Sequence, residues 1–203
     1  LTEIHRQAEG SPIIDLATAV REGRKISLGQ YGSSRVIRKA DLATGEALNH
    51  DQILVGRNAT RTAANRRARE LKKLPGVFPI AGDRLVCLRN DHDVGLLNGQ
   101  IWSVLDSGEI DDATLALTIE AEGLSSLSVE AHKATFEGKE LGWERMDAQE
   151  FDYGYALTVH KAQGSQWGSV ILFDESYCFR ADARRWLYTG LTRAAERVTV
   201  VTG

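Results

Sequence analysis

The 203-residue sequence predicts an α/β protein that is interrupted by a segment of a different kind. A short apolar strand at 51–56 runs into a helix at 60–74, an order typical of parallel α/β units. Apolar strands and a helix return at 155–201. Between these two parts the helical periodicity disappears, and short strands alternate with turns rich in Gly, Asn and Asp. We expect the two α/β parts to build one sheet, because neither part alone has enough strands for a stable layer.

The first α/β part opens with a short amphipathic helix. Apolar residues recur at helical spacing over 13–20, and Gly23 ends the helix. Ser11 and Pro12 supply a cap and a first-turn proline ahead of it. A polar stretch with weak period-two character follows, and it predicts one strand at 34–37. These elements precede the strand and helix described above.

The interrupting segment, residues 78–150, predicts a small antiparallel barrel. Strands are expected at 84–88 and 100–105, with a turn at 98–99 ahead of the second strand. A third strand is expected at 115–119, where large apolar residues alternate with small or polar ones. The segment is therefore expected to be a separate, inserted domain.

The second α/β part covers residues 151–203. Its expected elements are strands at 155–159, 170–173 and 198–201 and a helix at 183–194. Residues 1–77 and 151–203 are therefore expected to form one domain, and residues 78–150 interrupt it.

Charge is distributed unevenly along the chain. A net charge of -3 gives no overall signal for nucleic-acid binding. Residues 57–73, however, contain seven basic residues and one acid, whereas residues 103–150 contain twelve acids and three bases. This polarity favours a localised basic site beside an acidic region.

Composition excludes several classes of protein. Hydrophobic residues make up 42% and charged residues 26% of the chain, as in ordinary globular proteins and unlike disordered ones. Two cysteines are too few for a disulfide framework or a zinc site, and the histidines lack metal-ligand spacing. No apolar run reaches the length of a membrane span, and no signal peptide is evident. We expect free thiols, no metal site and a cytoplasmic location.

Two motifs carry the functional signal. Residues 155–165 read YALTVHKAQGS, and residues 186–194 read WLYTGLTRA. They resemble motifs V and VI of superfamily 1 helicases, and the sequence TVHKAQGS is most similar to that of the RecD-like branch. A phosphate-binding P-loop is missing from the sequence, since Gly138-Lys139 is followed by Glu140 and is preceded by no suitable glycine. We therefore expect the chain to be half of a motor, cut from a longer protein.

The resemblance extends over nearly the whole chain. Residues 1–8 look like the segment that opens the second motor domain of RecD-like helicases, and residues 53–69 lie where their motif IV lies. Residues 82–99 are similar to the SH3-like barrel that these proteins insert in that domain. The resemblance implies a RecA-like α/β domain that lacks its own P-loop and carries an inserted SH3-like β-barrel.

The activity implied is that of an ATP-dependent DNA helicase similar to the exodeoxyribonuclease V alpha subunit. Such a motor travels 5′ to 3′ on single-stranded DNA and serves DNA repair. ATP and Mg²⁺ would be bound mainly by an N-terminal motor domain that is absent from this sequence, and other exonuclease subunits are possible partners. The 203 residues alone are expected to have no ATPase activity.

The resemblance assigns one group of residues to the nucleotide. Arg193 corresponds to the arginine finger of motif VI and Arg6 to a second arginine at the γ-phosphate. A guanidinium suits this role because it offers several fixed donors to the charge that spreads over the phosphoryl oxygens. Gln163 and Gly164 would sense the nucleotide, and Gln166 occupies the place where many relatives have a glutamate that contacts the ribose.

A second group is assigned to DNA. By resemblance, Thr158 and His160 contact the DNA backbone, and the Ser165 side chain can also reach phosphate oxygens. The basic stretch at 57–73, which includes Arg61, could form a groove that follows the phosphates, and Asn58, Thr60 and Asn65 add hydrogen-bond donors that read no sequence. The alternative for this stretch is structural, because Asn58 and Thr60 can cap a helix whose basic face is simply solvated.

Two other functions stay open. The chain could be a degenerate motor domain that serves as a non-catalytic, nucleic-acid-binding scaffold. It could also be a metal-dependent nuclease, because Glu137 and Lys139 form a Glu-x-Lys triplet, although about one such triplet is expected by chance. The stretch at 170–175 resembles a Walker B strand, but we interpret it as the strand after motif V.

Overall fold

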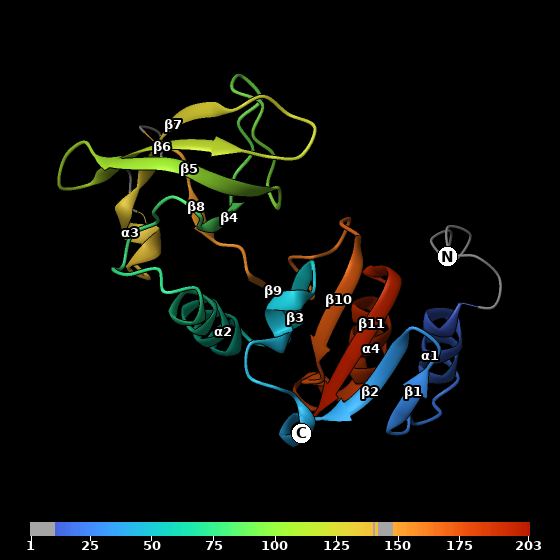
Figure 1. The fold of residues 1–203 in the computed structure, drawn as a ribbon. Coiled ribbons are helices and arrows are strands. Elements are labelled where there is room, and N and C mark those ends of the chain that lie inside the picture. Colours follow the sequence, from blue (N-terminus) through green and yellow to red (C-terminus); the bar gives the residue numbers. More distant parts are fainter. Residues whose placement is uncertain (1–10, 140, 142–147) are drawn as a thin grey trace. The chain divides into compact units, whose positions relative to one another are not determined.

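The computed structural model describes residues 11–139, 141 and 148–203 (Figure 1). The chain divides into two compact units. The first unit contains the chain up to Ala64 and again from Ala156 onward, and the second unit contains Asn65–Tyr155. The expected domain bounds, at 77/78 and 150/151, stay a prediction.

The first unit is built on a six-stranded sheet with the order β1-β2-β11-β10-β3-β9. The strands are β1 (Gly29–Tyr31), β2 (Ser34–Arg38), β3 (Gln52–Val55), β9 (Ala156–Thr158), β10 (Trp167–Phe173) and β11 (Ala194–Thr202). Only the hairpin of β1 and β2 is antiparallel, and all other neighbours are parallel. β3 lies between β10 and β9, so the prediction that both α/β parts build one sheet is confirmed.

The centre of this sheet is apolar because its strands are covered on both faces. All four residues of β3 are buried, and Ile171 of β10 pairs with Ile53 on one side and Thr199 of β11 on the other. Val55, Ala156 and Val201 complete one core cluster with Ile53 and Ile171. A nearly continuous run of β-branched and aliphatic residues is what such central parallel strands require.

Three longer helices belong wholly or partly to the first unit. They are α1 (Pro12–Arg21), α2 (Asn58–Leu71) and α4 (Ala183–Leu191), with 3₁₀ turns η2 (Lys39–Asp41), η3 (Glu46–Asn49) and η5 (Ser176–Asp182). α1 packs against α4 and β11, as Figure 1 shows. The predicted helices are confirmed, but α4 ends before Thr192, because Ala194 already pairs in β11. No helix among the described residues is long and apolar enough to cross a membrane.

The second unit holds a five-stranded antiparallel sheet with the order β7-β6-β5-β4-β8. Its elements are β4 (Arg84–Cys87), β5 (Ile101–Glu109), β6 (Thr114–Glu120), β7 (Leu127–His132), α3 (Lys133–Phe136) and β8 (Phe151–Tyr153). In β6 the side chains of Leu115, Leu117 and Ile119 are buried in alternation with more exposed ones. An isolated bridge joins Ala131 at the end of β7 to Gln149 just before β8.

The predicted strands at 84–88, 100–105 and 115–119 are confirmed. The sequence did not predict β7 or β8, and it placed the latter in the α/β domain. β8 instead pairs with β4, where Cys87 is opposite Phe151. A three-residue strand whose partner is far away in the sequence leaves too little periodicity to be recognised. The SH3-like closure of this sheet into a barrel stays a prediction.

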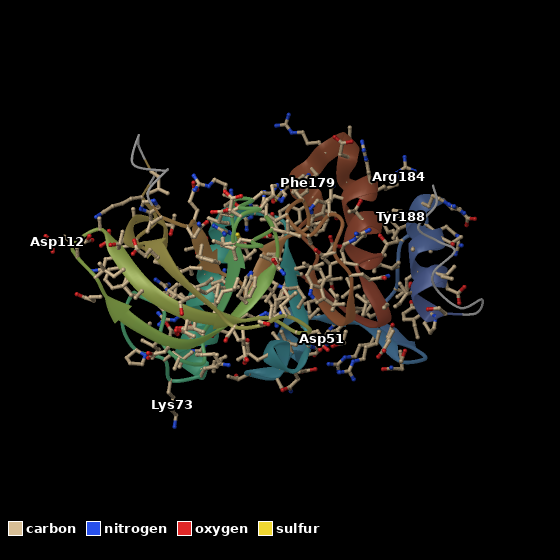
Figure 2. All side chains as sticks on the ribbon, turned by 90° about the horizontal axis from the view of Figure 1, so that it is seen from above. Asp51, Lys73, Asp112, Phe179, Arg184 and Tyr188 are labelled. Atoms are coloured by element: carbon tan, nitrogen blue, oxygen red, sulfur yellow. The ribbon has the colours of Figure 1, made fainter. Side chains whose placement is uncertain are left out.

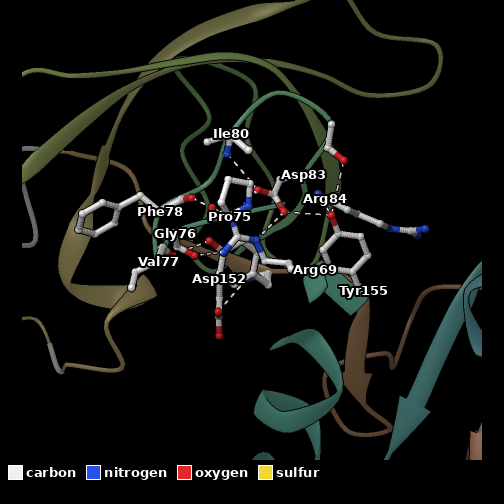
Figure 3. A network of polar contacts seen from close by, with 12 residues as sticks. Arg69, Pro75, Gly76, Val77, Phe78, Ile80, Asp83, Arg84, Asp152 and Tyr155 are labelled. Atoms are coloured by element: carbon white, nitrogen blue, oxygen red, sulfur yellow. Dashed lines mark hydrogen bonds and ion pairs between the residues drawn. The ribbon is translucent and has the colours of Figure 1, made fainter. Parts of the chain in front are cut away.

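A buried ion pair in the second unit joins the end of α2 to the loop before β4 (Figure 3). Arg69 at the end of α2 contacts Asp83 at 2.9 Å, and their side chains are 7% and 0% exposed. The guanidinium also donates to the backbone oxygens of Gly76 at 2.6 Å and Phe78 at 2.9 Å, and Tyr155 donates its hydroxyl to Asp83 at 3.0 Å. Arg69 therefore turns inward, so this member of the basic stretch does not lie on a solvated helix face.

Candidate functional site

The first predicted motif begins at the carboxyl end of β9. Val159 donates its backbone N–H to Val55 of β3 at 3.0 Å, which continues the sheet pairing one residue beyond the strand. Thr158 is buried, and its hydroxyl oxygen accepts the backbone N–H of Lys161 at 3.3 Å. His160 is exposed. The chain therefore turns away from the sheet directly after Thr158 and presents His160 to solvent.

The rest of the motif is a compact turn between β9 and β10. Gln163 donates its backbone N–H to His160 at 3.3 Å, and Ser165 donates to Ala162 at 3.1 Å. Gly164 has φ +89°, a conformation that side chains other than glycine's rarely adopt. The three residues assigned to the nucleotide, Gln163, Gly164 and Gln166, are all exposed on this turn. An exposed glycine turn lets a ligand approach the backbone closely.

Arg193 connects this turn to the second motif. The residue follows α4 and is only 5% exposed. Its guanidinium donates to the backbone oxygen of Ser165 at 3.1 Å and, through Nε, to that of Thr189 at 3.2 Å. The two predicted motifs therefore meet at a single side chain. A buried guanidinium held by carbonyl oxygens is fixed in direction, which is one requirement for stabilising a phosphoryl group.

Glu175 ties the end of the central sheet to the start of α2. Its carboxylate accepts the backbone N–H groups of Gly56 at 2.7 Å and Arg57 at 3.0 Å, and the Thr60 hydroxyl at 2.6 Å. An ion pair of 2.8 Å to the Arg57 guanidinium completes the set. A carboxylate at a helix N-terminus satisfies backbone N–H groups that lack intrahelical partners.

These contacts change the acidity of Glu175. Burial by itself raises the pKa of the carboxyl, but the hydrogen bonds from Thr60 and from the backbone of Arg57 and Gly56 outweigh it. The pKa of Glu175 therefore lies below its usual value. A carboxylate with this set of partners is a structural anchor, which agrees with the interpretation of 170–175 as a strand rather than a Walker B site.

A pocket opens beside the first motif, where three segments of the first unit meet. Its volume is about 250 Å³, and it is lined by Val159, His160, Gln163, Phe179, Asp182, Arg185, Trp186 and Thr189. The His160 and Phe179 rings are 5.4 Å apart, and the Phe179 and Trp186 rings stack at 5.1 Å with an angle of 11°. Figure 2 labels Phe179 on the segment that leads into α4, together with Arg184 and Tyr188 of that helix.

The predicted site residues thus fall into three places. Gln163 and His160 line the pocket, and Ser165 contacts Arg193. Asn58, Thr60 and Arg61 lie at the start of α2, where Asn58 is exposed, Arg61 is half-buried and Thr60 is bonded to Glu175. Arg6 lies outside the described residues.

Sequence reasoning missed four residues of this region: Glu175, Phe179, Arg185 and Trp186. The sequence showed Glu175 only as the end of a stretch that resembles a Walker B strand, and gave no sign of its contacts with the start of α2. Its bonds to Gly56 and Thr60 cross more than a hundred residues, and spacing gives no sign of them. Three aromatic residues within 177–186 were the one available signal for the pocket.

The residues behind the nuclease hypothesis lie in the second unit. Lys139 forms an ion pair of 2.7 Å with Glu137. Among the described residues, no group of three or more His, Cys, Asp or Glu side chains is placed to hold a metal ion.

Comparison with known proteins shows similarity to helicases. Residues 153–201 match the model of the UvrD-like helicase C-terminal domain. The ATP-dependent RecD2 DNA helicase of Deinococcus radiodurans is 28% identical over 228 residues, a match that covers 97% of this chain and 27% of that helicase. The chain thus spans about a quarter of the length of this curated relative.

Solved helicases share the fold. The crystal structure of Pif1 helicase from Bacteroides in complex with ADP-AlF3 and ssDNA has a TM-score of 0.53 at 16% identity, over 96% of this chain and 49% of that chain. Pif1 helicase from Candida albicans gives 0.54 at 15% identity, over 97% of this chain and 54% of that one. In sequence and in fold, the chain is therefore similar to the C-terminal part of a superfamily 1, RecD-like helicase, and residues 153–201 correspond to a UvrD-like helicase C-terminal domain.

Proposed function

We propose that the chain is the C-terminal half of a cytoplasmic, ATP-dependent DNA helicase that moves 5′ to 3′ on single-stranded DNA. The observation that carries the proposal is Arg193, whose guanidinium bonds both to Ser165 in the first motif and to Thr189 in the second. Arg193 is assigned to the nucleotide and Ser165 to DNA. A side chain that joins the two motifs in this way can transmit a conformational change from the nucleotide site to the DNA site. The RecD2 and Pif1 names of the similar proteins support the same activity.

On the nucleotide side, Arg193 and Arg6 act at the γ-phosphate. Gln163, Gly164 and Gln166 face the rest of the nucleotide from their exposed turn. ATP with Mg²⁺, held mainly by an N-terminal motor domain, supplies the phosphoryl group whose transfer drives the cycle. The bonds to carbonyl oxygens hold the Arg193 guanidinium in one orientation, from which it can offer N–H donors to such a group. Arg193 offers these donors to the charge that develops during transfer.

On the DNA side, the residues at the carboxyl end of β9 hold the strand. The exposed His160, the Thr158 hydroxyl and Ser165 bind phosphate oxygens, and Asn58, Thr60 and Arg61 extend this surface from the start of α2. Contacts of this kind carry no sequence information, as a translocating motor requires. Thr60 already donates its hydroxyl to Glu175. It therefore contributes to the DNA surface by its position at the start of α2 and not by that hydrogen-bond donor.

The proposal is tested by ATPase measurements on a chain that joins these 203 residues to an N-terminal motor domain. We expect Arg193→Ala to lower the single-stranded-DNA-stimulated kcat by about a thousandfold or more, with ATP binding largely kept. Arg184→Ala removes an exposed arginine from α4 and serves as the matched control, with kcat unchanged. An unchanged rate for Arg193→Ala would refute the finger role. The 203 residues alone are expected to show no ATPase activity.

The runner-up is a non-catalytic scaffold. It is favoured by the burial of Arg193, whose bonds to carbonyl oxygens also suit a purely structural side chain. A scaffold would bind single-stranded DNA but would stay without ATPase activity even when joined to the N-terminal motor domain. The same joined chain therefore separates the two functions.

A further inference from the structure

The pocket beside the first motif extends along α4 from Asp182 to Thr189, and Thr189 is the residue whose backbone oxygen accepts Arg193 Nε at 3.2 Å. Asp182 and Arg185 lie at the start of α4, whereas Arg193 follows its end. A helix of nine residues is about 13 Å long, so the end of the pocket at Asp182 is about that far from Arg193 along the helix. The pocket lies at the carboxyl end of β9, with His160 at its rim. His160 is a residue that the proposed function assigns to DNA, and Gln163 is one that it assigns to the nucleotide.

One wall of the pocket is a column of aromatic rings. Trp186 is buried, Phe179 is half-buried and stacks on it almost in parallel, and the exposed His160 ring is tilted by 46° to Phe179. The column therefore becomes more accessible from Trp186 towards His160. Flat apolar faces that remain partly open offer a surface on which another flat ring can stack.

The other walls are polar. Gln163 and Thr189 carry groups that both donate and accept hydrogen bonds, Asp182 accepts, and Arg185 adds an exposed positive charge. The indole Nε1 of Trp186 is buried and has no acceptor among the described residues. Buried donors are nearly always paired in folded proteins, with protein groups or with water, so this donor is open to an acceptor that the described residues do not supply.

The framework behind the pocket is rigid. A Cβ atom placed on Gly56 would lie 3.0 Å from Phe179 and 2.8 Å from Glu175, so the chain packs closely at this point. The Glu175 carboxylate holds Gly56 in turn. Phe179 is therefore backed by the same contacts that fix the start of α2. A preformed wall lowers the ordering cost of binding.

We propose that this pocket binds one nucleobase of single-stranded DNA. The base stacks against Phe179 and His160, and Arg185 contacts the neighbouring phosphate. A volume of about 250 Å³ lies just below the range of about 300–1,000 Å³ typical of drug-sized ligands, which suits a single base. The base of a free nucleotide has the same chemistry, but the exposed His160 ring at the rim, which the proposed function assigns to DNA, favours a base within the strand. The inference rests on the proposed function, because it gives the DNA side of that function a base contact.

The first experiment uses the 203-residue chain and a short oligo-dT that carries a single abasic site, moved one position at a time. Fluorescence anisotropy measures the affinity for each oligonucleotide. If one base occupies the pocket, we expect its removal to weaken binding by about 5- to 100-fold at one position only. A flat profile, with every position equal, overturns the proposal.

A second experiment replaces the ring itself. Phe179→Leu keeps an apolar side chain but removes the flat face, and we expect it to weaken binding of the unmodified oligonucleotide and to flatten the abasic profile. Tyr177→Ala is the matched control, since it removes a 68% exposed ring from the same segment that does not line the pocket. If the control changes the profile as much as Phe179→Leu does, the pocket is not the binding place.

A third arm separates the two sources of a base. A 2-aminopurine placed at the sensitive position of the oligonucleotide should be quenched in the wild-type chain and less so in Phe179→Leu. ADP should leave this signal unchanged, whereas displacement of the base by ADP would show that the pocket holds a free nucleotide and would overturn the assignment to DNA. If the wild-type chain binds no oligonucleotide at all, the DNA side of the proposed function fails. Binding without base dependence defeats this inference alone.

Discussion

The two units of the chain use buried carboxylates in different ways. In the second unit, Asp83 is fully buried and paired with Arg69, and the pair lies under the loop that leads into β4. In the first unit, Glu175 is 8% exposed and its partner Arg57 is 54% exposed, at the edge where the candidate site lies. Asp83 therefore stabilises the fold of the second unit, whereas Glu175 positions residues of the candidate site in the first unit.

Apart from Tyr155, the residues of the two motifs lie in the first unit, and the direction of its strands gives a physical reason. Parallel strands end together at one edge, so loops from distant parts of the sequence meet there, as the segments with His160, Phe179 and Arg185 do. In the antiparallel unit, successive strands alternate in direction and their polar groups are spread over both ends. Three changes, taken from the largest expected effect to the smallest, sharpen this comparison.

The largest effect is expected from Asp83→Ala. The substitution leaves the Arg69 guanidinium buried without its carboxylate, which costs about 3–5 kcal/mol of stability. Urea unfolding measures the loss, and amide hydrogen exchange shows where it falls. We expect β4 and β5 to lose protection while β10 and β11 keep theirs.

Glu70→Gln on α2 is the control for this change. Glu70 pairs with Arg67 at 3.1 Å, but both side chains are more than half exposed, so the substitution should cost less than about 1 kcal/mol. Equal losses for Asp83→Ala and Glu70→Gln, or loss of protection in both units, would contradict the idea that the second unit carries its own buried anchor.

A smaller and pH-dependent effect is expected from Glu175→Gln. Hydrogen bonds to a charged group contribute about 1.5–3 kcal/mol, and the amide replaces one charged acceptor by a neutral one. Because the pKa of Glu175 is lowered in the folded state, its contribution is fully present at neutral pH. The contribution is lost as the pH falls below the usual glutamate value of about 4.3 and through the folded pKa.

Urea unfolding at several pH values checks the Glu175 prediction. The difference in stability between the wild type and Glu175→Gln should shrink on acidification. Glu22→Gln, which removes one partner of an exposed ion pair with Arg24, should show a small difference at every pH. A gap that stays constant between pH 7 and acid would rule out the carboxylate charge as its source.

The smallest effect is expected from Gly190→Ala in α4. A Cβ atom there would lie 2.8 Å and 2.9 Å from the two terminal carbons of the buried Leu172, so α4 must move off the sheet at a cost of about 1–3 kcal/mol. Gly108→Ala in β5 is the control in the other unit, where the added atom meets nothing within 4 Å. Thermal unfolding compares the two, and a loss for Gly108→Ala as large as that for Gly190→Ala would contradict the packing argument.

Much of the first unit could be predicted because its signals are local. The helix that became α1 has its periodicity, its proline and its final glycine within a dozen residues. The strands that became β3 and β10 are short apolar runs with clear ends. β10 also lies between the two motifs in the sequence. At these places the local sequence signals all favour the same secondary structure.

The rest depends on partners that are distant in the sequence. β8 is three residues long and is a strand only because it pairs with β4. Arg69 belongs to a basic stretch, and only the loop around Asp83 turns it into a buried residue. Phe179 and His160 are neighbours because η5 and the turn after β9 meet in space. Spacing along the chain gives no information about such contacts.

The sequence by itself determined the class of the fold, the order of the main elements and the two motifs with Arg193, His160 and Gly164. These features reside in runs of residues that are contiguous or regularly spaced, so local sterics and periodicity are enough to specify them. Only the tertiary structure decided that Arg193 is buried against Ser165, that Glu175 caps α2 and that an aromatic pocket adjoins His160. Those arrangements depend on which side chains are buried together, away from water. The packing of the chain in three dimensions determines this.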